Sequence, residues 1–375
     1  MGIPNDCTLK LSHKWKAGRL NKITDVPGVK LANVTVQSGD INTGVTAILP
    51  HDENIFRSKP AAGVSVLNGF GKSMGIVQLQ ELGNIETPII MTNTLSVGEA
   101  ANALIKYCLE QNEDIGVSTG TVNPIVTECN DGRLNDIRGM HISEKHVNEA
   151  LRMAAESGDD FDEGAVGAGT GMCCLGFKGG IGSASKIVRL DGKEYTIGAL
   201  VLSNFGEEGN LVIGGRRYGS ELLSAVKQRL EDDKENPKGA AKSRVKPEEA
   251  GAKPTGDEEK KDKGSIIMII ATDIPLSSRQ LCRVANRAAI ALGRTGSYMG
   301  NGSGDIAIAF STSNRMPHYS DSKFVETKIL FEDAIDEVFE PAVEAVEEAI
   351  ISSLYHAKTT KGIRDNIVYG LKEFL

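Results

Sequence analysis

The feature that most constrains this chain is an abrupt change of character near residue 264. Residues 231–263 carry ten acidic side chains, nine basic side chains and three prolines, and almost no apolar ones. Such a segment buries too little apolar surface to offset the entropy lost on ordering, so we predict a disordered, charged linker. After Gly264 and Ser265 the chain is apolar from Ile266 to Thr272, which predicts a short strand buried on both faces.

Strands and helices are mixed along the rest of the chain. The predicted strands are Pro88–Thr92, Thr196–Asn204 and Ile306–Phe310. The predicted helices are Ala100–Gln111, Ser143–Ser157, Tyr218–Arg229, Leu281–Leu292 and Lys323–Ala357. Strands separated by long helices favour layers of helix packed on sheet. The length of 375 residues gives a prior of about two domains but also allows one large domain.

Local signals set the expected ends of these helices. Two capping boxes predict helix starts, one formed by Ser96 with Glu99 and one by Ser277 with Gln280. Gly293 is the expected stop of the second of these helices. Pro341 marks a break or a new first turn in the last helical region.

Charge and composition exclude several classes of function. The net charge is −8, which argues against broad binding of nucleic acid or anionic membranes, because both need a basic surface. No apolar run approaches the roughly 18 residues of a membrane span, and the N-terminal residues are polar, so we expect a cytoplasmic protein. The six cysteines form no C-x-x-C pair and the histidines do not cluster with them. We therefore expect free thiols, no metal and no cofactor.

Familiar catalytic motifs are missing from the sequence. Residues 164–182 are rich in glycine but lack the G-K-[ST] ending of a phosphate-binding loop, so close backbone packing is the favoured interpretation. There is no G-x-S-x-G sequence of the hydrolase type, and the six histidines are scattered. A Ser-His-Asp triad therefore has no support.

The junction between Gly264 and Ser265 offers a different chemistry. If this peptide bond is cut, Ser265 becomes a new N-terminus whose α-amine has a reference pKa of about 7.7–8.0. Such an amine can act as general base for the hydroxyl of the same residue, so no histidine is needed. The hydroxyl can also make the cut itself, by attacking the carbonyl of Gly264, and a glycine before the bond tolerates the strained geometry.

Several separated motifs, in the right order, resemble the L-aminopeptidase/D-esterase (DmpA-like) family, which includes the β-peptidyl aminopeptidases. The apolar strand with the residues around it, Gly264–Leu276, is similar to the self-processing site of that family. Four further segments carry the resemblance: Asp25–Val29, Asn130–Gly139, Leu202–Gly206 and Gly302–Thr312. The resemblance covers most of the chain and leaves out only the charged linker.

The resemblance implies a fold and an activity. The implied fold is an αββα four-layer sandwich of the α/β class, shared with the ornithine acetyltransferases, with residues 1–375 as a single catalytic domain. The implied activity is self-cleavage at Gly264–Ser265, followed by removal of N-terminal residues from small peptides, amides or esters. The fragments 1–264 and 265–375 are expected to stay together and to assemble into a homo-oligomer, a tetramer of cleaved pairs.

Roles carry over by position. Ser265 matches the nucleophile and Asn204 matches an oxyanion-stabilising asparagine. Ser303 matches a serine that holds the amine of the nucleophile. Asp305 stands where some members have a glutamate, so it keeps the carboxylate but shortens its reach by one methylene.

The turn around residues 128–133 completes the predicted site. Arg133 falls where the family leads us to expect a tyrosine; a guanidinium supplies positive charge to an oxyanion but cannot act as a phenolic proton donor. Glu128 and Asp131 are candidates for binding the free ammonium group of a substrate. Solvated loop carboxylates are the competing interpretation of these two residues.

Two alternatives stay open at this point. One is an acyltransferase related to the ornithine acetyltransferases, which use a threonine nucleophile where this chain has Ser265. The other is an uncleaved, non-catalytic homologue, which the substitution at Arg133 and the long linker slightly favour. The stereochemistry of the substrate, α-L, β or D, is open as well.

Overall fold

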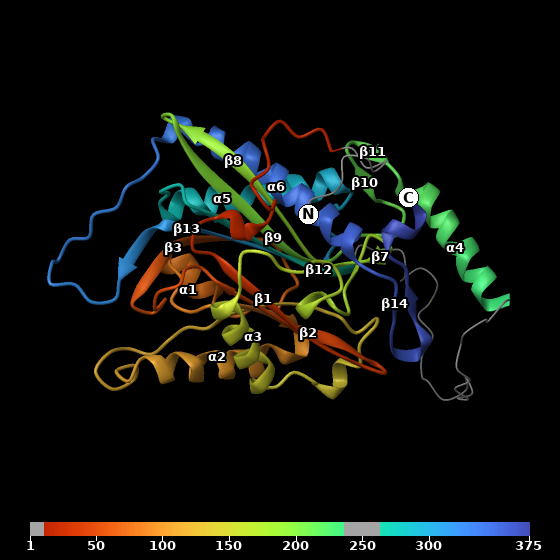
Figure 1. The fold of residues 1–375 in the computed structure, drawn as a ribbon, viewed down its shortest axis with the longest axis horizontal. Helices are drawn as coiled ribbons and strands as arrows, with labels where there is room; N and C mark the ends of the chain where they lie inside the picture. The colour runs from red at the N-terminus through yellow and green to blue at the C-terminus, as the bar shows by residue number, and fades with distance from the viewer. Residues whose placement is uncertain (1–10, 236–262) are drawn as a thin grey trace.

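The computed structural model describes residues 11–235 and 263–375. Two β-sheets stack face to face at the centre (Figure 1). The first sheet has the order β1-β2-β4-β5, with β1 at Lys30–Ser38, β2 at Ile41–Leu49, β4 at Ile89–Asn93 and β5 at Ile125–Cys129. The second has the order β3-β13-β12-β9-β8, with β3 at Ser58–Gly69, β13 at Gly302–Pro317, β12 at Lys263–Thr272, β9 at Lys193–Asn204 and β8 at Gly180–Leu190.

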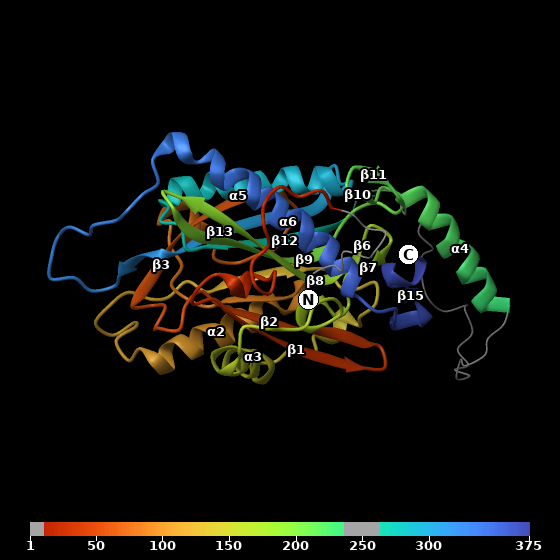
Figure 2. The same cartoon turned by 45° about the horizontal axis from the view of Figure 1, so that its top comes forward.

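Helices cover the outer face of each sheet. Helices α2 (Val97–Gln111) and α3 (Glu144–Glu156) pack on the four-stranded sheet, and α5 (Ser278–Thr295) and α6 (Asp336–His356) pack on the five-stranded one (Figures 1 and 2). The predicted αββα sandwich is therefore confirmed. Helix α1 (Ile76–Glu81) contacts β3, and α4 (Gly219–Glu235) lies beside the C-terminal residues. Three short strand pairs complete the fold: β6 (Cys173–Cys174) with β7 (Phe177–Lys178), β10 (Val212–Ile213) with β11 (Arg216–Arg217), and β14 (Thr360–Lys361) with β15 (Ile367–Val368).

Strand β12 is central in its sheet and is buried on both faces, as its apolar run predicts. From Ile266 to Ala271, the even-numbered residues pack in the core beneath α5 and α6, and the odd-numbered residues pack in the core between the sheets. This alternation follows from the two-residue period of a strand. β12 pairs in parallel with β13 and antiparallel with β9. Its first residues therefore lie beside the start of β13 and the end of β9.

Several predicted boundaries are corrected by the structure. The helix predicted from Ser96 and Glu99 exists, but the capping box does not form: the Asn93 side chain accepts from the Ser96 N–H, and Glu99 accepts from the backbone of Glu144. The box of Ser277 with Gln280 does form. That helix continues past Gly293 to Thr295, because Gly296 is the residue with the left-handed backbone that caps it.

The last helix and the linker also differ from expectation. Residues 323–331 form no helix, α6 starts at Asp336, and Pro341 lies inside it. Residues 231–235 of the predicted linker continue α4, and residue 263 belongs to β12. The remaining linker, residues 236–262, lies outside the described residues. Within residues 11–235 and 263–375, none of the helices combines the length and apolar character needed to cross a bilayer.

Candidate active site

Ser265 is at the start of β12, and its side chain is nearly buried. The residue is 6% exposed, and its Oγ accepts a hydrogen bond of 3.2 Å from the Gly304 N–H. In the sheet register Ser265 is opposite Gly304 on β13 and opposite Asn204 on β9. Ser265, Asn204 and the Ser303–Asp305 segment, predicted as parts of one site from distant parts of the chain, thus come together at one end of the sheet.

Gly264 has a backbone that disfavours any other residue. Its φ is +138°, and a Cβ added there would lie 2.1 Å from the carbonyl oxygen of Asn204. A side chain is therefore excluded both by the dihedral angle and by the close approach of β9. The bond predicted to be cut is the one that follows Gly264, near the start of β12.

Both ends of the Asn204 side-chain amide are held. Its Oδ1 accepts from the Cys173 N–H at 2.8 Å, and its Nδ2 donates to the carbonyl oxygen of Asn130 at 3.0 Å. These two contacts fix which end of the amide is the donor. An amide NH₂ group has two hydrogens, so Nδ2 can donate to Asn130 and to a second acceptor. The role of Asn204 in stabilising an oxyanion stays a prediction, and it depends on this second hydrogen.

Ser303 and Asp305 form a buried pair on the strand next to Ser265. Ser303 Oγ donates to Asp305 Oδ1 at 2.6 Å, and the two residues are 0% and 1% exposed. Ser303 is opposite Gly264 in the register, which puts it beside the predicted cleavage bond. Asp305 therefore reaches the Ser303 hydroxyl even though it is shorter than the glutamate of some family members.

Glu128, at the end of β5, has a buried carboxylate facing this region. Its Oε1 accepts from the Lys72 N–H at 2.8 Å and its Oε2 accepts from the Thr94 hydroxyl. A Cβ placed on Gly71 would lie 3.7 Å from Glu128 Oε1 and 3.8 Å from the Cα of Gly304. Glu128 is thus a near neighbour of the residue that contacts Ser265 Oγ, and it is not the solvated loop carboxylate that the competing interpretation describes.

Asp131 is placed differently. It is fully buried, its Oδ1 accepts from Asn135 at 3.0 Å, and burial raises its pKa to about 6, opposed by hydrogen bonds from Thr43 and Asn135. Its carboxylate thus turns inward and holds the turn that carries Asn130. A role in binding the ammonium group of a substrate stays an untested prediction for this residue.

Arg133 lies at the exposed end of the same turn. Its guanidinium forms a 3.1 Å ion pair with Glu208, and the two side chains are 52% and 41% exposed. Glu208 follows Asn204 in the loop after β9. The pair therefore links the two segments that carry Asn130 and Asn204.

Lys178 is a residue of the site that sequence reasoning missed. It is fully buried, and its Nζ donates to the carbonyl oxygens of Gly169, Met172 and Gly179 at 2.7–2.9 Å. Burial lowers the pKa of Lys178 to about 8. These contacts fold the glycine-rich segment, which supplies the Cys173 N–H that holds Asn204. A lone lysine in an apolar, glycine-rich stretch is the sequence signal that points to it.

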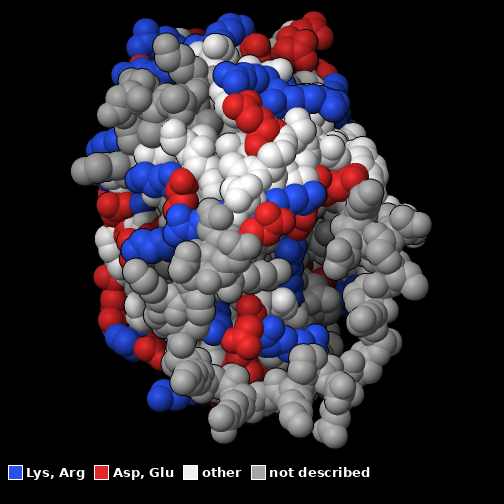
Figure 3. All heavy atoms as spheres, turned by 90° about the vertical axis from the view of Figure 1, so that its right-hand side faces the viewer, with Lys and Arg blue, Asp and Glu red and all other residues white. Residues whose placement is uncertain are grey.

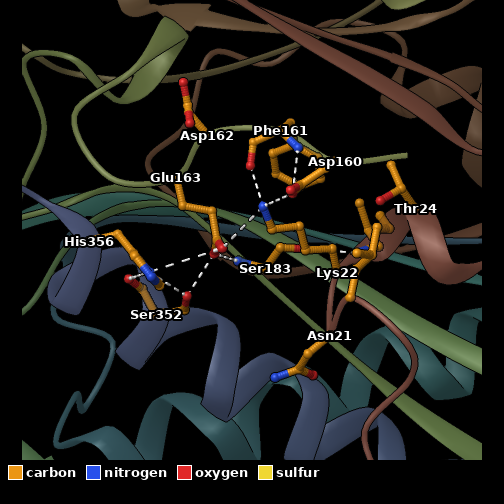
Figure 4. A network of polar contacts seen from close by, with 12 residues as sticks. Asn21, Lys22, Thr24, Asp160, Phe161, Asp162, Glu163, Ser183, Ser352 and His356 are labelled. Atoms are coloured by element: carbon orange, nitrogen blue, oxygen red, sulfur yellow. Dashed lines mark hydrogen bonds and ion pairs between the residues drawn. The ribbon is translucent and has the colours of Figure 1, made fainter. Parts of the chain in front are cut away.

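A second polar network belongs to the scaffold. Glu163 is buried and accepts from the Ser183 N–H at 2.7 Å and from the Ser352 hydroxyl at 2.6 Å, while Lys22 and His356 flank it (Figure 4). Burial raises the pKa of Glu163. The network connects the N-terminal segment, strand β8 and helix α6. The polar groups named here have hydrogen-bond or ion-pair partners within it.

No metal centre emerges from the described ranges, in which no three His, Cys, Asp or Glu side chains cluster to hold an ion. Charges are also mixed on the face shown in Figure 3, where basic and acidic side chains alternate among the residues drawn in colour.

Comparisons with known proteins identify the family of the chain. The model of Peptidase family S58 matches residues 21–368. Beta-peptidyl aminopeptidase BapA of Sphingosinicella microcystinivorans is 38% identical over 365 residues, 95% of this chain and 86% of that protein.

Solved structures match over almost the whole chain. The PH0078 protein of Pyrococcus horikoshii OT3 is 50% identical with a TM-score of 0.84, covering 97% of this chain and 94% of that one. The L-aminopeptidase D-Ala-esterase/amidase of Ochrobactrum anthropi, a prototype of the serine aminopeptidases with a variant of the Ntn-hydrolase fold, is 32% identical with a TM-score of 0.81, covering 97% and 93%. The predicted family and fold are confirmed: the chain belongs to peptidase family S58 and is a hydrolase of the aminopeptidase class.

Proposed function

We propose that this protein is an autoproteolytic serine aminopeptidase that cuts its own Gly264–Ser265 bond and then hydrolyses N-terminal residues from small peptides, amides or esters. The observation that carries the proposal is the junction itself. Gly264 has a backbone conformation that favours glycine, and the next residue is a buried serine. Its Oγ accepts from a backbone N–H, and it is opposite Asn204 in the sheet register. The names of the relatives, a β-peptidyl aminopeptidase and an L-aminopeptidase D-Ala-esterase/amidase, support the same class of reaction.

Self-cleavage would proceed in two steps. Ser265 Oγ attacks the carbonyl carbon of Gly264, the C–N bond breaks as the nitrogen takes up a proton, and an ester forms between the two residues. Water then hydrolyses the ester, which leaves a carboxylate on Gly264 and a free hydroxyl and α-amine on Ser265. Because Gly264 has no side chain, nothing on its Cα obstructs the approach of Oγ to the carbonyl carbon.

Hydrolysis of a substrate would then use the hydroxyl and the free α-amine of Ser265. The α-amine of Ser265 takes the hydroxyl proton as Oγ attacks the carbonyl of the substrate, and it returns the proton to the leaving amine. Asn204 Nδ2 stabilises the oxyanion, a contribution of typically about 3 kcal/mol for one such donor. Ser303 and Asp305 hold the α-amine, and Glu128 binds the ammonium group of the substrate. Water then releases the acyl group.

An intact mass spectrum under denaturing conditions tests the proposal. Two species are expected, one ending at Gly264 and one beginning at Ser265. The Ser265→Ala variant should stay a single folded chain of 40.0 kDa without hydrolase activity. Ser224→Ala, which removes an exposed hydroxyl on α4, is the matched control and should be processed normally. Activity above background in Ser265→Ala would overturn the assignment.

Assembly into a homo-oligomer is part of the same proposal. Residues 318–331 extend away from the sheets after β13 (Figures 1 and 2), and Phe324 and Phe331 on this arm are 84% and 73% exposed. Large exposed apolar side chains are typical of protein interfaces, which supports association with further copies of the chain. Light scattering is expected to give a multiple of 40.0 kDa for the wild type. A monomer at micromolar concentration would contradict this expectation.

A further inference from the structure

The ion pair of Arg133 and Glu208 lies beside the group proposed to bind the oxyanion. Arg133 is three residues after Asn130, whose carbonyl accepts from Asn204, and Glu208 is four residues after Asn204 itself. A Cβ on Gly176, in the glycine-rich segment, would lie 3.1 Å from Glu208 Cγ. The ion pair therefore links the turn after β5 to the loop after β9, and the glycine-rich segment packs against Glu208.

The pKa of the Cys173 thiol also indicates that the ion pair lies near Asn204. Burial raises the pKa of the Cys173 thiol, Arg133 opposes that shift and Glu208 adds to it. Cys173 is the residue whose N–H holds Asn204 Oδ1. Both charges of the pair thus act at the residue next to the oxyanion amide.

The pair is suited to being opened. Both side chains are about half exposed, and ion pairs between exposed side chains contribute little to stability. A guanidinium offers a planar fork of donors that matches a carboxylate with two parallel hydrogen bonds. In the structure Glu208 supplies that carboxylate, so its position shows where an incoming anion would bind.

Three groups follow one another along the segment 128–133, which runs from the end of β5 into the turn after it. The carboxylate of Glu128 is at one end, Asn130 contacts Asn204 in the middle, and the guanidinium of Arg133 is at the other end. In a dipeptide the charges have the complementary order: an ammonium group, then the scissile carbonyl, then a carboxylate one residue later. A peptide with a neutral C-terminus has no carboxylate at this position that could bind the guanidinium.

We infer that Arg133 selects short substrates in which the residue after the scissile bond carries a free carboxylate, with Glu208 as the anion displaced on binding. This inference rests on the proposed function, because it assigns the leaving-group side of the same site. It makes Arg133 a specificity residue, which differs from the oxyanion role that its position predicts.

Paired substrates test the inference. For an N-terminal residue that the wild type accepts as a p-nitroanilide, kcat/KM is measured on its dipeptide with glycine and on the matching glycinamide. The wild type should prefer glycine by at least about tenfold. Arg133→Gln should bring the ratio close to one, Arg133→Lys should give an intermediate ratio because it keeps the charge without the fork, and Glu208→Gln should raise the ratio.

The controls separate the two proposals. Arg138→Gln removes an exposed charge five residues further along and should leave the ratio unchanged. If Arg133→Gln lowers both rates equally, Arg133 acts on the oxyanion and the inference is wrong. A wild type that hydrolyses p-nitroanilides but shows no preference for glycine overturns the inference alone. A wild type that cleaves neither itself nor any substrate overturns the proposed function and the inference with it.

Discussion

Ser303 Oγ donates a 2.6 Å hydrogen bond to Asp305 Oδ1, and both residues are almost completely buried on the strand beside Ser265. A buried carboxylate that accepts from a hydroxyl fixes the rotamer of that hydroxyl. In the sheet register Ser303 is opposite Gly264, the residue before the backbone nitrogen that would become the α-amine. Under the proposed function, the pair would position this amine once the chain is cut.

Asp305→Asn should lower kcat by about 10- to 100-fold, within the range that a positioned acid–base group contributes. The amide keeps the size of the side chain, but it accepts less strongly and is neutral, so the α-amine is held less well. KM should change little, because Asp305 is not on the proposed binding face for the ammonium group. Steady-state kinetics check this, with Asp333→Asn, on an exposed position, as the control. Wild-type kcat in Asp305→Asn would contradict the assignment.

Gly264→Ala should block or strongly slow self-cleavage. A methyl group there would meet the carbonyl oxygen of Asn204 at 2.1 Å, in a backbone with φ of +138°. The start of β12 must then shift away from β9, which removes Ser265 from Asn204. The fraction of 40.0 kDa chain remaining over time measures the effect.

Gly293→Ala is the control for this experiment, because a Cβ added at that position meets nothing within 4 Å. It should be processed at the wild-type rate. Processing of Gly264→Ala at that same rate would show that the conformation of Gly264 is not required for the reaction.

The accuracy of the sequence predictions followed the range of the interactions involved. The burial of Ile266–Ala271 on both faces of a strand and the box of Ser277 with Gln280 depend on neighbours in the chain, and both were predicted correctly. The box at Ser96 failed because Asn93, three residues earlier, caps the helix entrance through a short 3₁₀ turn. The spacing of Ser and Glu alone cannot show that competition.

The predictions for the site can be separated in the same way. The resemblance assigned Ser265, Asn204, Ser303 and Asp305 to one site, and the structure has them at one end of the same sheet. Burial could not be predicted from the motif: Asp131 and Arg133 are two residues apart, yet one turns into the core and the other into solvent. The three carbonyl acceptors of Lys178 come from a loop closure that no local pattern encodes.

Asp131→Asn should raise the free energy of unfolding, relative to the wild type, more at neutral pH than at acidic pH. Burial raises the pKa of Asp131 to about 6, above the unfolded value of about 3.9, so ionisation is disfavoured in the folded state. The wild type therefore loses stability as pH rises from about 4 to about 6, by roughly 2–3 kcal/mol for this shift of about two units. The amide does not ionise, so it avoids that loss while keeping an acceptor for Asn135.

Denaturant unfolding of wild type and variant at pH 4 and pH 7 measures this effect as the change in their difference. Asp321→Asn, on an exposed position, serves as the control, and its difference from the wild type should be nearly constant. A difference for Asp131→Asn that stays the same at the two pH values would show that Asp131 is ionised as easily in the folded state as in the unfolded one.

Lys178→Met should lower kcat without touching the nucleophile. The substitution keeps the length of the side chain but leaves the carbonyl oxygens of Gly169, Met172 and Gly179 without their donor, and each buried acceptor left unsatisfied costs about 1–3 kcal/mol. Relief from burying the lysine charge offsets part of that cost, since burial alone lowers the pKa of Lys178 to about 8. The glycine-rich segment should then loosen around Cys173, and Asn204 should lose its fixed orientation. We expect kcat to fall by about 10- to 100-fold, less than the 10²–10³ typical of deleting an oxyanion donor, because Asn204 itself remains.

Steady-state kinetics are measured well below the melting temperature, with Lys145→Met on the exposed face of α3 as the control. This comparison separates the local effect from unfolding. A folded Lys178→Met variant with wild-type kcat would mean that the orientation of Asn204 does not depend on this segment.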